Sequence, residues 1–218
     1  MKLLAIDGNS IINRAFYGIR LLTTKDGRYT NAVYGFINIL NRLKETEGPD
    51  GIAVAFDIKK PTFRHKEYAE YKAGRHATPP ELLEQFAPLK DWLRFMGYAV
   101  IECEGYEADD IIGTVSRICA ENEDECVIVT GDRDSFQLIE NDGTSVLLVS
   151  SRMGKTETTM YNGAELLMKY GLPPELMRDL KALQGDSSDN IPGVRGIGEK
   201  TAKLFAKLNI HNVYDLLH

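Results

Sequence analysis

The sequence predicts an α/β fold, with a mostly parallel sheet flanked by helices and a small helical module after it. Up to about residue 160, short apolar runs alternate with longer segments of helical periodicity, the pattern of parallel strands joined by crossover helices. From about Tyr161 onward, short helical segments are broken by Gly and Pro, without convincing strands. We therefore expect an α/β domain over residues 1–160 and a helical module over residues 161–218.

The strand candidates are short apolar runs. They are Leu3–Ile6, Ile52–Phe56, Ala99–Glu102, Val127–Thr130, Ser145–Val149 and Lys155–Met160, of which the last two can pair with each other. The helix candidates carry apolar residues at helical spacing. They are Asn31–Glu45, Glu81–Met96 and Ala108–Glu121. Gly and Pro mark most of the boundaries between these segments.

Composition bounds the class of protein. Of 218 residues, 43% are hydrophobic, which is enough for a substantial core. No apolar run approaches the roughly 20 residues of a membrane span, so we expect a soluble, cytoplasmic protein. The cysteines Cys103, Cys119 and Cys126 are odd in number and lack CxxC spacing, which predicts reduced thiols. The net charge of −6 argues against a protein that coats nucleic acid through bulk positive charge, so any such contact must be local.

Three strand candidates run directly into aspartates. LLAID ends at Asp7, AVAFD ends at Asp57, and VIVTGD ends at Asp132, with Asp134 two residues later. The carboxyl ends of parallel strands form one ligand crevice, so these side chains should converge there. Converging carboxylates repel one another unless a multivalent cation neutralises them. Oxygen ligands without paired His or Cys point to Mg²⁺ or Mn²⁺ rather than to zinc.

Two further acidic clusters lie at predicted helix starts and turns. GYEADD supplies Glu107, Asp109 and Asp110, and GDSSDN supplies Asp186 and Asp189. Taken alone, the first could complement a helix dipole and the second could be a polar turn with a helix cap. Together, the clusters suit metal-assisted hydrolysis of a phosphodiester, with two metal ions roughly 4 Å apart and no protein nucleophile.

The segment IPGVRGIGEKTAKLF, residues 191–205, has the form of a helix-hairpin-helix. Its glycines allow a tight turn and close backbone approach, and the following helix start can hold a phosphate. A purely structural hairpin is the alternative. The predicted DNA contacts are Gly193, Arg195, Gly196, Gly198, Lys200, Thr201 and Lys203. Such a module grips backbone without reading bases.

The stretch from Lys59 to His76 is the most basic in the chain, with six Lys or Arg against two Glu. It follows Asp57, so Arg64, Lys72 and Arg75 could reach a phosphate at the metal site. A solvated loop is the alternative. The aromatic residues Phe63, Tyr68 and Tyr71 could stack on an unpaired base. Near Asp7, Phe16 and Tyr17 could likewise stack on a terminal base or pack on a helix face.

A series of motifs then resembles a known family. They are AIDGNS, AFD followed by TFRHKEYAEYKAGR, GYEADD, TGDRDSFQL and QGDSSDNIPGVRGIGEKTA, and they span Ile6 to Ala202. Together they resemble the 5′ nuclease family, most closely the N-terminal 5′→3′ exonuclease domain of bacterial DNA polymerase I. The resemblance is more distant to phage 5′ nucleases and eukaryotic flap endonucleases. It implies a PIN-like fold, a helical arch near residues 59–80, and a helix-hairpin-helix that can hold K⁺ through backbone carbonyls.

The resemblance also implies an activity: cleavage of DNA at 5′ flaps and 5′ ends, as in primer removal and repair. By position, the ligands of a first Mg²⁺ ion and its waters would be Asp7, Asp57, Glu107, Asp109, Asp110 and Asp132. The second group would be Asp134, Asp186 and Asp189, and Mn²⁺ could substitute for Mg²⁺. In the family's YKxxR pattern, Lys72 and Arg75 match arch residues that contact the scissile phosphate, with Arg64 in support.

Other interpretations share parts of the pattern. A PIN-type ribonuclease has the acidic crevice, but the hairpin and the arch motif count against it. A non-catalytic module that binds nicks or flaps would have no use for carboxylates that repel phosphate. The sequence stops at His218, where family members continue with further helices. We therefore expect a monomer that is either part of a longer polymerase or a short stand-alone nuclease.

Overall fold

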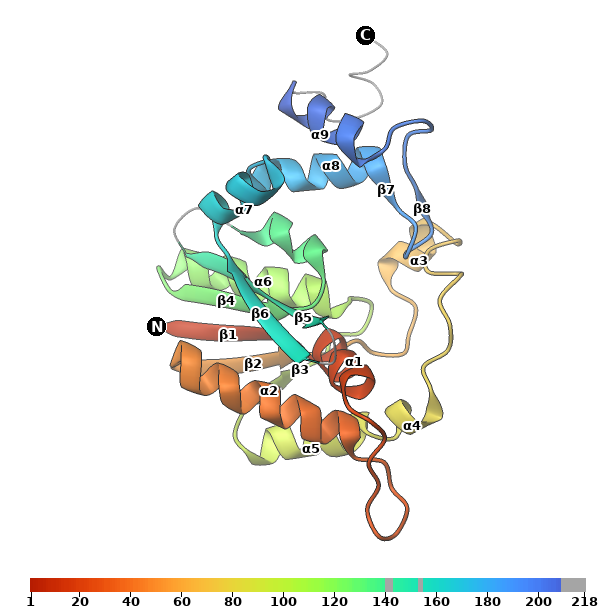
Figure 1. Ribbon diagram of the computed structural model, residues 1–218, viewed down its shortest axis with the longest axis vertical. Helices are drawn as coiled ribbons and strands as arrows, with labels where there is room; N and C mark the ends of the chain where they lie inside the picture. The colour runs from red at the N-terminus through yellow and green to blue at the C-terminus, as the bar shows by residue number, and fades with distance from the viewer. Residues whose placement is uncertain (140–142, 153–154, 209–218) are drawn as a thin grey trace.

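A six-stranded sheet in the order β3-β2-β1-β4-β5-β6 forms the centre of the molecule (Figure 1). The computed structural model describes residues 1–139, 143–152 and 155–208. The strands are β1 (Lys2–Asp7), β2 (Gly51–Ala55), β3 (Ala99–Ile101), β4 (Glu125–Thr130), β5 (Thr144–Arg152) and β6 (Lys155–Tyr161). Neighbours from β3 to β5 pair in parallel, whereas β5 and β6 pair antiparallel. The predicted mostly parallel sheet and the pairing of its last two strands are therefore confirmed.

Helices cover both faces of the sheet. On one face lie α1 (Gly8–Gly18), α2 (Asn31–Glu47) and α5 (Phe86–Phe95), and on the other lies α6 (Ala108–Glu121) (Figure 1). Side chains alternate along β1, so that Leu4 and Ile6 enter the core under α1 and α2 while Ala5 enters the core under α6. This alternation gives each face of the sheet its own apolar core.

Two of the three predicted helices agree with the structure, and the third is divided. The predicted Glu81–Met96 helix is two helices, α4 (Pro80–Leu83) and α5. Pro88 lacks the N–H that a continuous helix would direct to the carbonyl of Glu84. Gln85, between the two helices, turns inward and accepts hydrogen bonds from the amides of Ala32 and Val33 in the first turn of α2. The break between α4 and α5 thus supplies a hydrogen-bond acceptor for the backbone amides at the start of α2.

The chain after β6 forms the helical module. Its elements are α7 (Gly163–Tyr170), the 3-10 helix η2 (Pro174–Leu176), α8 (Met177–Gln184), β7 (Gly185–Asp186), β8 (Ile191–Pro192) and α9 (Glu199–Lys207). The short antiparallel strands β7 and β8 correct the expectation that this module has none. The part of the predicted module beyond residue 208 lies outside the described residues.

The basic stretch lies beside the strands β7 and β8 (Figure 1). It contains one short helix, α3 (Phe63–Glu67), followed by a turn in which Lys72 has a left-handed φ of 59°. The Lys72 amide donates to the carbonyl of Asp189 at 2.9 Å, and Asn190 donates to the carbonyl of Glu70 at 2.9 Å. These contacts join the stretch to the helical module. Within the described residues, no helix has the length and apolar character to cross a membrane.

Candidate active site

Two aspartates are fixed where β1 and β2 end. Asp7 is the last residue of β1, caps α1, and accepts a hydrogen bond from the Thr130 hydroxyl at 2.9 Å. Asp57 follows β2 and accepts hydrogen bonds from the Asn9 amide group at 2.9 Å and from the Ala108 backbone amide at 2.7 Å. These bonds hold both carboxylates at the carboxyl edge of the sheet, beside the start of α6. The predicted convergence of the strand ends is therefore present.

Two more aspartates complete what we call the first acidic group: Asp7, Asp57, Asp109 and Asp132. Asp132 follows β4 and caps the 3-10 helix η1 (Arg133–Leu138), and Asp109 lies in the first turn of α6. Burial raises the pKa of Asp7 to about 6 despite its hydrogen bonds, and Asp57 and Asp132 add to the rise. Burial and then repulsion from Asp7, Asp132 and Asp57 raise the pKa of Asp109 to about 8. The four carboxylates therefore act on one another electrostatically.

The first acidic group has the chemistry of a cation site. In the described residues, no Lys or Arg forms an ion pair with any of its members. In the part of the chain that the structure describes, no three or more His, Cys, Asp or Glu side chains are already arranged to hold a metal ion. The donors are all oxygen atoms, and their mutual repulsion is what a divalent cation would relieve. Their chemistry suits a hard divalent cation, but the side chains would have to move together to coordinate one.

The neighbouring carboxylates of α6 are already paired with cations of the basic stretch. Glu107, which caps α6, lies 2.8 Å from Lys72 Nζ and 2.9 Å from the Tyr71 hydroxyl. Asp110 receives two hydrogen bonds of 2.7 Å from the Arg64 guanidinium. These bonds from Arg64 help to hold the pKa of Asp110 below its usual value, against the effect of burial. The predicted phosphate contacts Lys72 and Arg64 thus face the predicted metal ligands.

Asp189 connects the basic stretch to the helical module. Its carboxylate forms an ion pair with Arg75 and lies 3.2 Å from the Tyr71 hydroxyl and 3.9 Å from Lys72 Nζ. Tyr71 is only 6% exposed and its single hydroxyl proton is shared between Glu107 and Asp189. The expectation that Tyr71 stacks on a base is therefore wrong for this arrangement, because its ring is buried.

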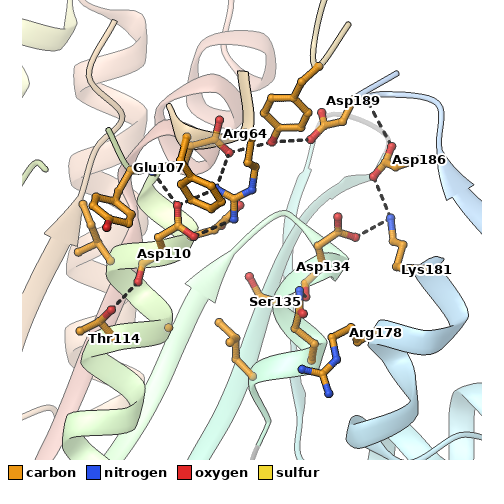
Figure 2. Close-up of a pocket in the computed structure, with 18 of the residues that line it drawn as sticks. Arg64, Glu107, Asp110, Thr114, Asp134, Ser135, Arg178, Lys181, Asp186 and Asp189 are labelled. Carbon is orange, nitrogen blue, oxygen red and sulfur yellow. Dashed lines mark hydrogen bonds and ion pairs between the residues drawn. The ribbon is translucent and has the colours of Figure 1, made fainter. Parts of the chain in front are cut away.

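Asp134 and Asp186, which we call the second acidic pair, share one lysine. Lys181 Nζ on α8 lies 2.6 Å from Asp134 Oδ1 and 3.0 Å from Asp186 Oδ2 (Figure 2). Burial raises the pKa of Asp186, but hydrogen bonds from Ser188 and Lys181 outweigh burial and hold it at about 2. The structure thus divides the six ligands predicted for the first ion: four have no cationic partner in the described residues, whereas Glu107 and Asp110 are paired with Lys72 and Arg64. All three residues of the predicted second group are paired with Lys or Arg.

Six of the nine predicted acidic residues line a cavity of about 1050 Å³, whereas Asp7, Asp57 and Asp132 do not line it. It extends between α6 and α8, with Glu107, Asp109 and Asp110 on one side and Asp134, Asp186 and Lys181 on the other (Figure 2). The exposed ring of Tyr106 and the half-exposed ring of Phe63 stand at the same cavity, 5.9 Å apart. The cavity thus combines an acidic wall with apolar surface.

The predicted DNA contacts of the hairpin differ in what they face. Gly193 is exposed, but its backbone lies so close to that of Gln184 that an added Cβ would come within 2.2 Å of the Gln184 carbonyl oxygen. Gly196 has a left-handed φ of 83°, and neither it nor Gly198 has a neighbour within 4 Å of an added Cβ. Lys203 pairs with Glu199 on α9 at 2.7 Å. The side chains of Arg195 and Lys200 are exposed and that of Thr201 is partly buried.

Sequence reasoning missed several residues that shape the site. Lys181 gave no signal beyond its place five residues before Asp186, and the buried role of Tyr71 was hidden among exposed aromatics. Arg14 donates to the carbonyl of Gly131 at 2.6 Å, next to Asp132. Near Asp7, one of the two aromatic residues packs inward and the other is free to stack on a base. Phe16 packs against the core, whereas Tyr17 is 71% exposed.

Comparison with known families places the chain. Residues 2–171 match the family described as 5′-3′ exonuclease, N-terminal resolvase-like domain, and residues 172–216 match 5′-3′ exonuclease, C-terminal SAM fold. This chain belongs to the 5′-3′ exonuclease family. DNA polymerase I of Bacillus caldotenax is 48% identical over 201 residues, which cover 92% of this chain and 23% of that protein. For DNA polymerase I of Bacillus subtilis the identity is 47%, with 92% and 22% covered. The chain thus spans less than a quarter of these relatives.

Solved structures of lower identity share the exonuclease fold. The bacteriophage T5 D15 protein, co-crystallised with metal ions, superposes with a TM-score of 0.76 at 24% identity, covering 100% of this chain and 78% of that one. The T5 5′-exonuclease with bound zinc gives a TM-score of 0.77 at 24% identity, with the same coverage. A T5 flap endonuclease variant in complex with DNA and metal ions gives 0.76 at 23% identity, again with 100% and 78% covered.

Proposed function

We propose that this protein is a structure-specific 5′ nuclease that hydrolyses DNA phosphodiesters at 5′ ends and 5′ flaps. The observation that carries the proposal is the first acidic group, four carboxylates at the carboxyl edge of the sheet without cationic partners in the described residues. A binding module for DNA would gain nothing from such a charge, because it repels phosphate. A metal-dependent phosphodiesterase requires it.

The cations we assign are two Mg²⁺ ions, for which Mn²⁺ could substitute. Asp7, Asp57, Asp109 and Asp132 would hold the first, and the second acidic pair with Asp189 would hold the second. Glu107 and Asp110 lie beside the first acidic group and would accept hydrogen bonds from water molecules bound to the first ion. Bound there, the metals would lower the pKa of an attacking water and stabilise the leaving 3′ oxygen.

The chain's own residues would bind and orient the substrate. Lys72, Arg75 and Arg64 form ion pairs with Glu107, Asp189 and Asp110, respectively. A scissile phosphate at the metals would compete with these carboxylates for the three cations. Exchange of one anionic partner for another keeps each cation in place while the substrate enters. The rings of Phe63 and Tyr106 are accessible and could stack on an unpaired base.

The helix-hairpin-helix would hold the duplex by its backbone. Gly196 and Gly198 leave the hairpin open to close approach, and the exposed Arg195 and Lys200 supply positive charge. Gly193, Thr201 and Lys203 would support this contact from within, and carbonyls of the hairpin could hold K⁺. In a cell we place this nuclease in primer removal and DNA repair, beside or fused to a DNA polymerase, as its curated relatives suggest.

A flap-cleavage assay tests the proposal. The protein is incubated with a 5′-labelled flap duplex and Mg²⁺, and we expect a short 5′ product that is lost in EDTA and in Asp132→Ala. The matched control is Asp124→Ala, because Asp124 lies at the opposite edge of the sheet and pairs with the chain's N-terminal ammonium at 2.7 Å. If the intact protein leaves the flap uncut, or cuts it equally well in EDTA, the proposed function is wrong.

A further inference from the structure

The second acidic pair contains a positive charge supplied by the chain. Lys181 Nζ lies within 3.0 Å of carboxylate oxygens from two different elements, Asp134 on η1 and Asp186 on β7 (Figure 2). Such distances are those of direct ion pairs. In the described residues, no comparable contact exists for the four members of the first acidic group. The two parts of the acidic crevice are therefore electrostatically different.

The fold holds this lysine in place. Lys181 lies in the last turn of α8, which ends at Gln184. Gly185 follows with a positive φ of 73°, so the chain turns and Asp186 faces back toward that last turn. Any residue with a Cβ at Gly185 would come within 2.2 Å of the Gly193 amide nitrogen. The position of Asp186 relative to Lys181 is thus set by the backbone rather than by the two side chains alone.

The lysine also takes the oxygens that a metal would need. The amide and hydroxyl of Ser188 donate to Asp186 Oδ1 at 2.8 and 2.6 Å, which leaves Oδ2 as the atom without a backbone partner. Lys181 occupies this Oδ2 and, on the other side, Oδ1 of Asp134. A divalent ion bridging the same two oxygens would stand within a few ångströms of the ammonium, and like charges at that distance repel strongly.

We propose that Lys181 is a built-in counterion of the second acidic pair, which a divalent ion must displace before it can bind there. The inference rests on the proposed function, since it assumes that this pair takes a metal. It has two consequences. The first acidic group fills at a lower metal concentration than the second pair, and in the metal-free protein Lys181 offsets one of the two negative charges of the second pair.

Metal binding without DNA tests the inference. Mn²⁺ is titrated into the whole protein by calorimetry, and we compare Lys181→Met, which removes the charge, with Lys181→Arg, which keeps it. We expect a tight and a weak site in the unchanged protein, and a weak site that tightens roughly tenfold in Lys181→Met but not in Lys181→Arg. The control is Lys2→Met, because Lys2 also bridges two carboxylates, Glu47 at 3.2 Å and Glu125 at 3.6 Å, away from the crevice.

Urea unfolding in EDTA gives a second measurement. Loss of the counterion leaves Asp134 and Asp186 to repel each other, so Lys181→Met should unfold at a lower urea concentration than the unchanged protein. Mn²⁺ should restore the lost stability and so reduce this difference. If Lys181→Met is not obtained folded, Lys181→Gln removes the charge while keeping a hydrogen-bond donor, and the same results are expected. The inference is overturned if the weak site is unchanged, or is equally tightened by Lys181→Arg or Lys2→Met.

The outcomes separate this inference from the proposed function. A protein that cuts flaps, but whose metal binding does not respond to Lys181→Met, remains a nuclease without a counterion role for Lys181. A protein that cuts no flap, but whose weak site tightens in Lys181→Met, keeps the counterion and loses the nuclease assignment.

Discussion

At the scale of residues, the site is defined by which carboxylates the chain neutralises and which it leaves charged. Arg64, Lys72 and Lys181 each hold one or two of them. Asp7 and Asp109 instead carry raised pKa values, because burial and neighbouring carboxylates disfavour their ionised forms. Without metal, Asp109, with a pKa of about 8, holds a proton near neutral pH, whereas Asp7, with a pKa of about 6, takes one up in mild acid.

The raised pKa values of Asp7 and Asp109 should make the free energy of unfolding depend on pH. A folded pKa of about 6 for Asp7, above its unfolded value of 3.8, contributes stability that is full below pH 3.8 and is lost as pH rises through 6. The loss is on the order of 3 kcal/mol for this buried group. Asp109 extends the loss toward pH 8, although water still reaches its side chain and moderates the effect.

We therefore expect the free energy of unfolding in EDTA, measured with urea, to fall as the pH rises from about 4 to about 8. Asp7→Asn keeps a capping side chain on α1 without the titration, so its curve should be flatter over this range. An unchanged slope in Asp7→Asn would show that Asp7 titrates normally and that the first acidic group is not a region of strained negative charge.

At the scale of elements, the basic stretch, which we call the arch after the sequence-based prediction, joins the α/β domain to the helical module. Its residues Tyr71, Lys72 and Arg75 all contact Asp189, which follows β7, and the first two also contact Glu107. Sequence patterns could place the basic stretch near Asp57 but could not give these pairings, which depend on how a helical module far along the chain packs. Sequence patterns likewise could not show that the predicted Glu81–Met96 helix is divided, because Gln85 turns inward to accept hydrogen bonds from the first turn of α2.

The arch cations should affect chemistry more than binding. Because Lys72 and Arg75 stand at the carboxylates rather than along a duplex surface, Lys72→Ala and Arg75→Ala are expected to lower single-turnover flap cleavage by roughly 10- to 100-fold. Duplex affinity should change by less than about threefold. Lys44→Ala, on the far helix α2, is the control, since Lys44 donates to the Tyr98 hydroxyl instead. Equal losses of binding and cleavage would contradict this division of roles.

At the scale of the whole molecule, the net charge of −6 conceals a separation of charge. The acidic residues of the crevice face the cations of the arch and α8, and the exposed Arg195 and Lys200 lie on the hairpin beyond them. The mostly parallel sheet and the aspartates at its carboxyl edge could be predicted from the sequence, because three of the apolar runs lead directly into Asp7, Asp57 and Asp132. The order of the strands could not, because no local pattern records it. The pairing of the other carboxylates of the site with Lys and Arg could not be predicted, because ion pairs between distant segments leave no local pattern in the sequence.

Anomalous diffraction from crystals soaked in Mn²⁺ tests the central claim most directly. The account predicts a strong peak among Asp7, Asp57, Asp109 and Asp132 at low Mn²⁺ concentration, and a peak near Asp134 and Asp186 only at higher concentration. The same soak of Asp109→Asn should weaken the first peak, since one ionised ligand is lost. A peak only at the Lys181 side of the crevice, or none at the sheet edge at saturating Mn²⁺, would contradict the account.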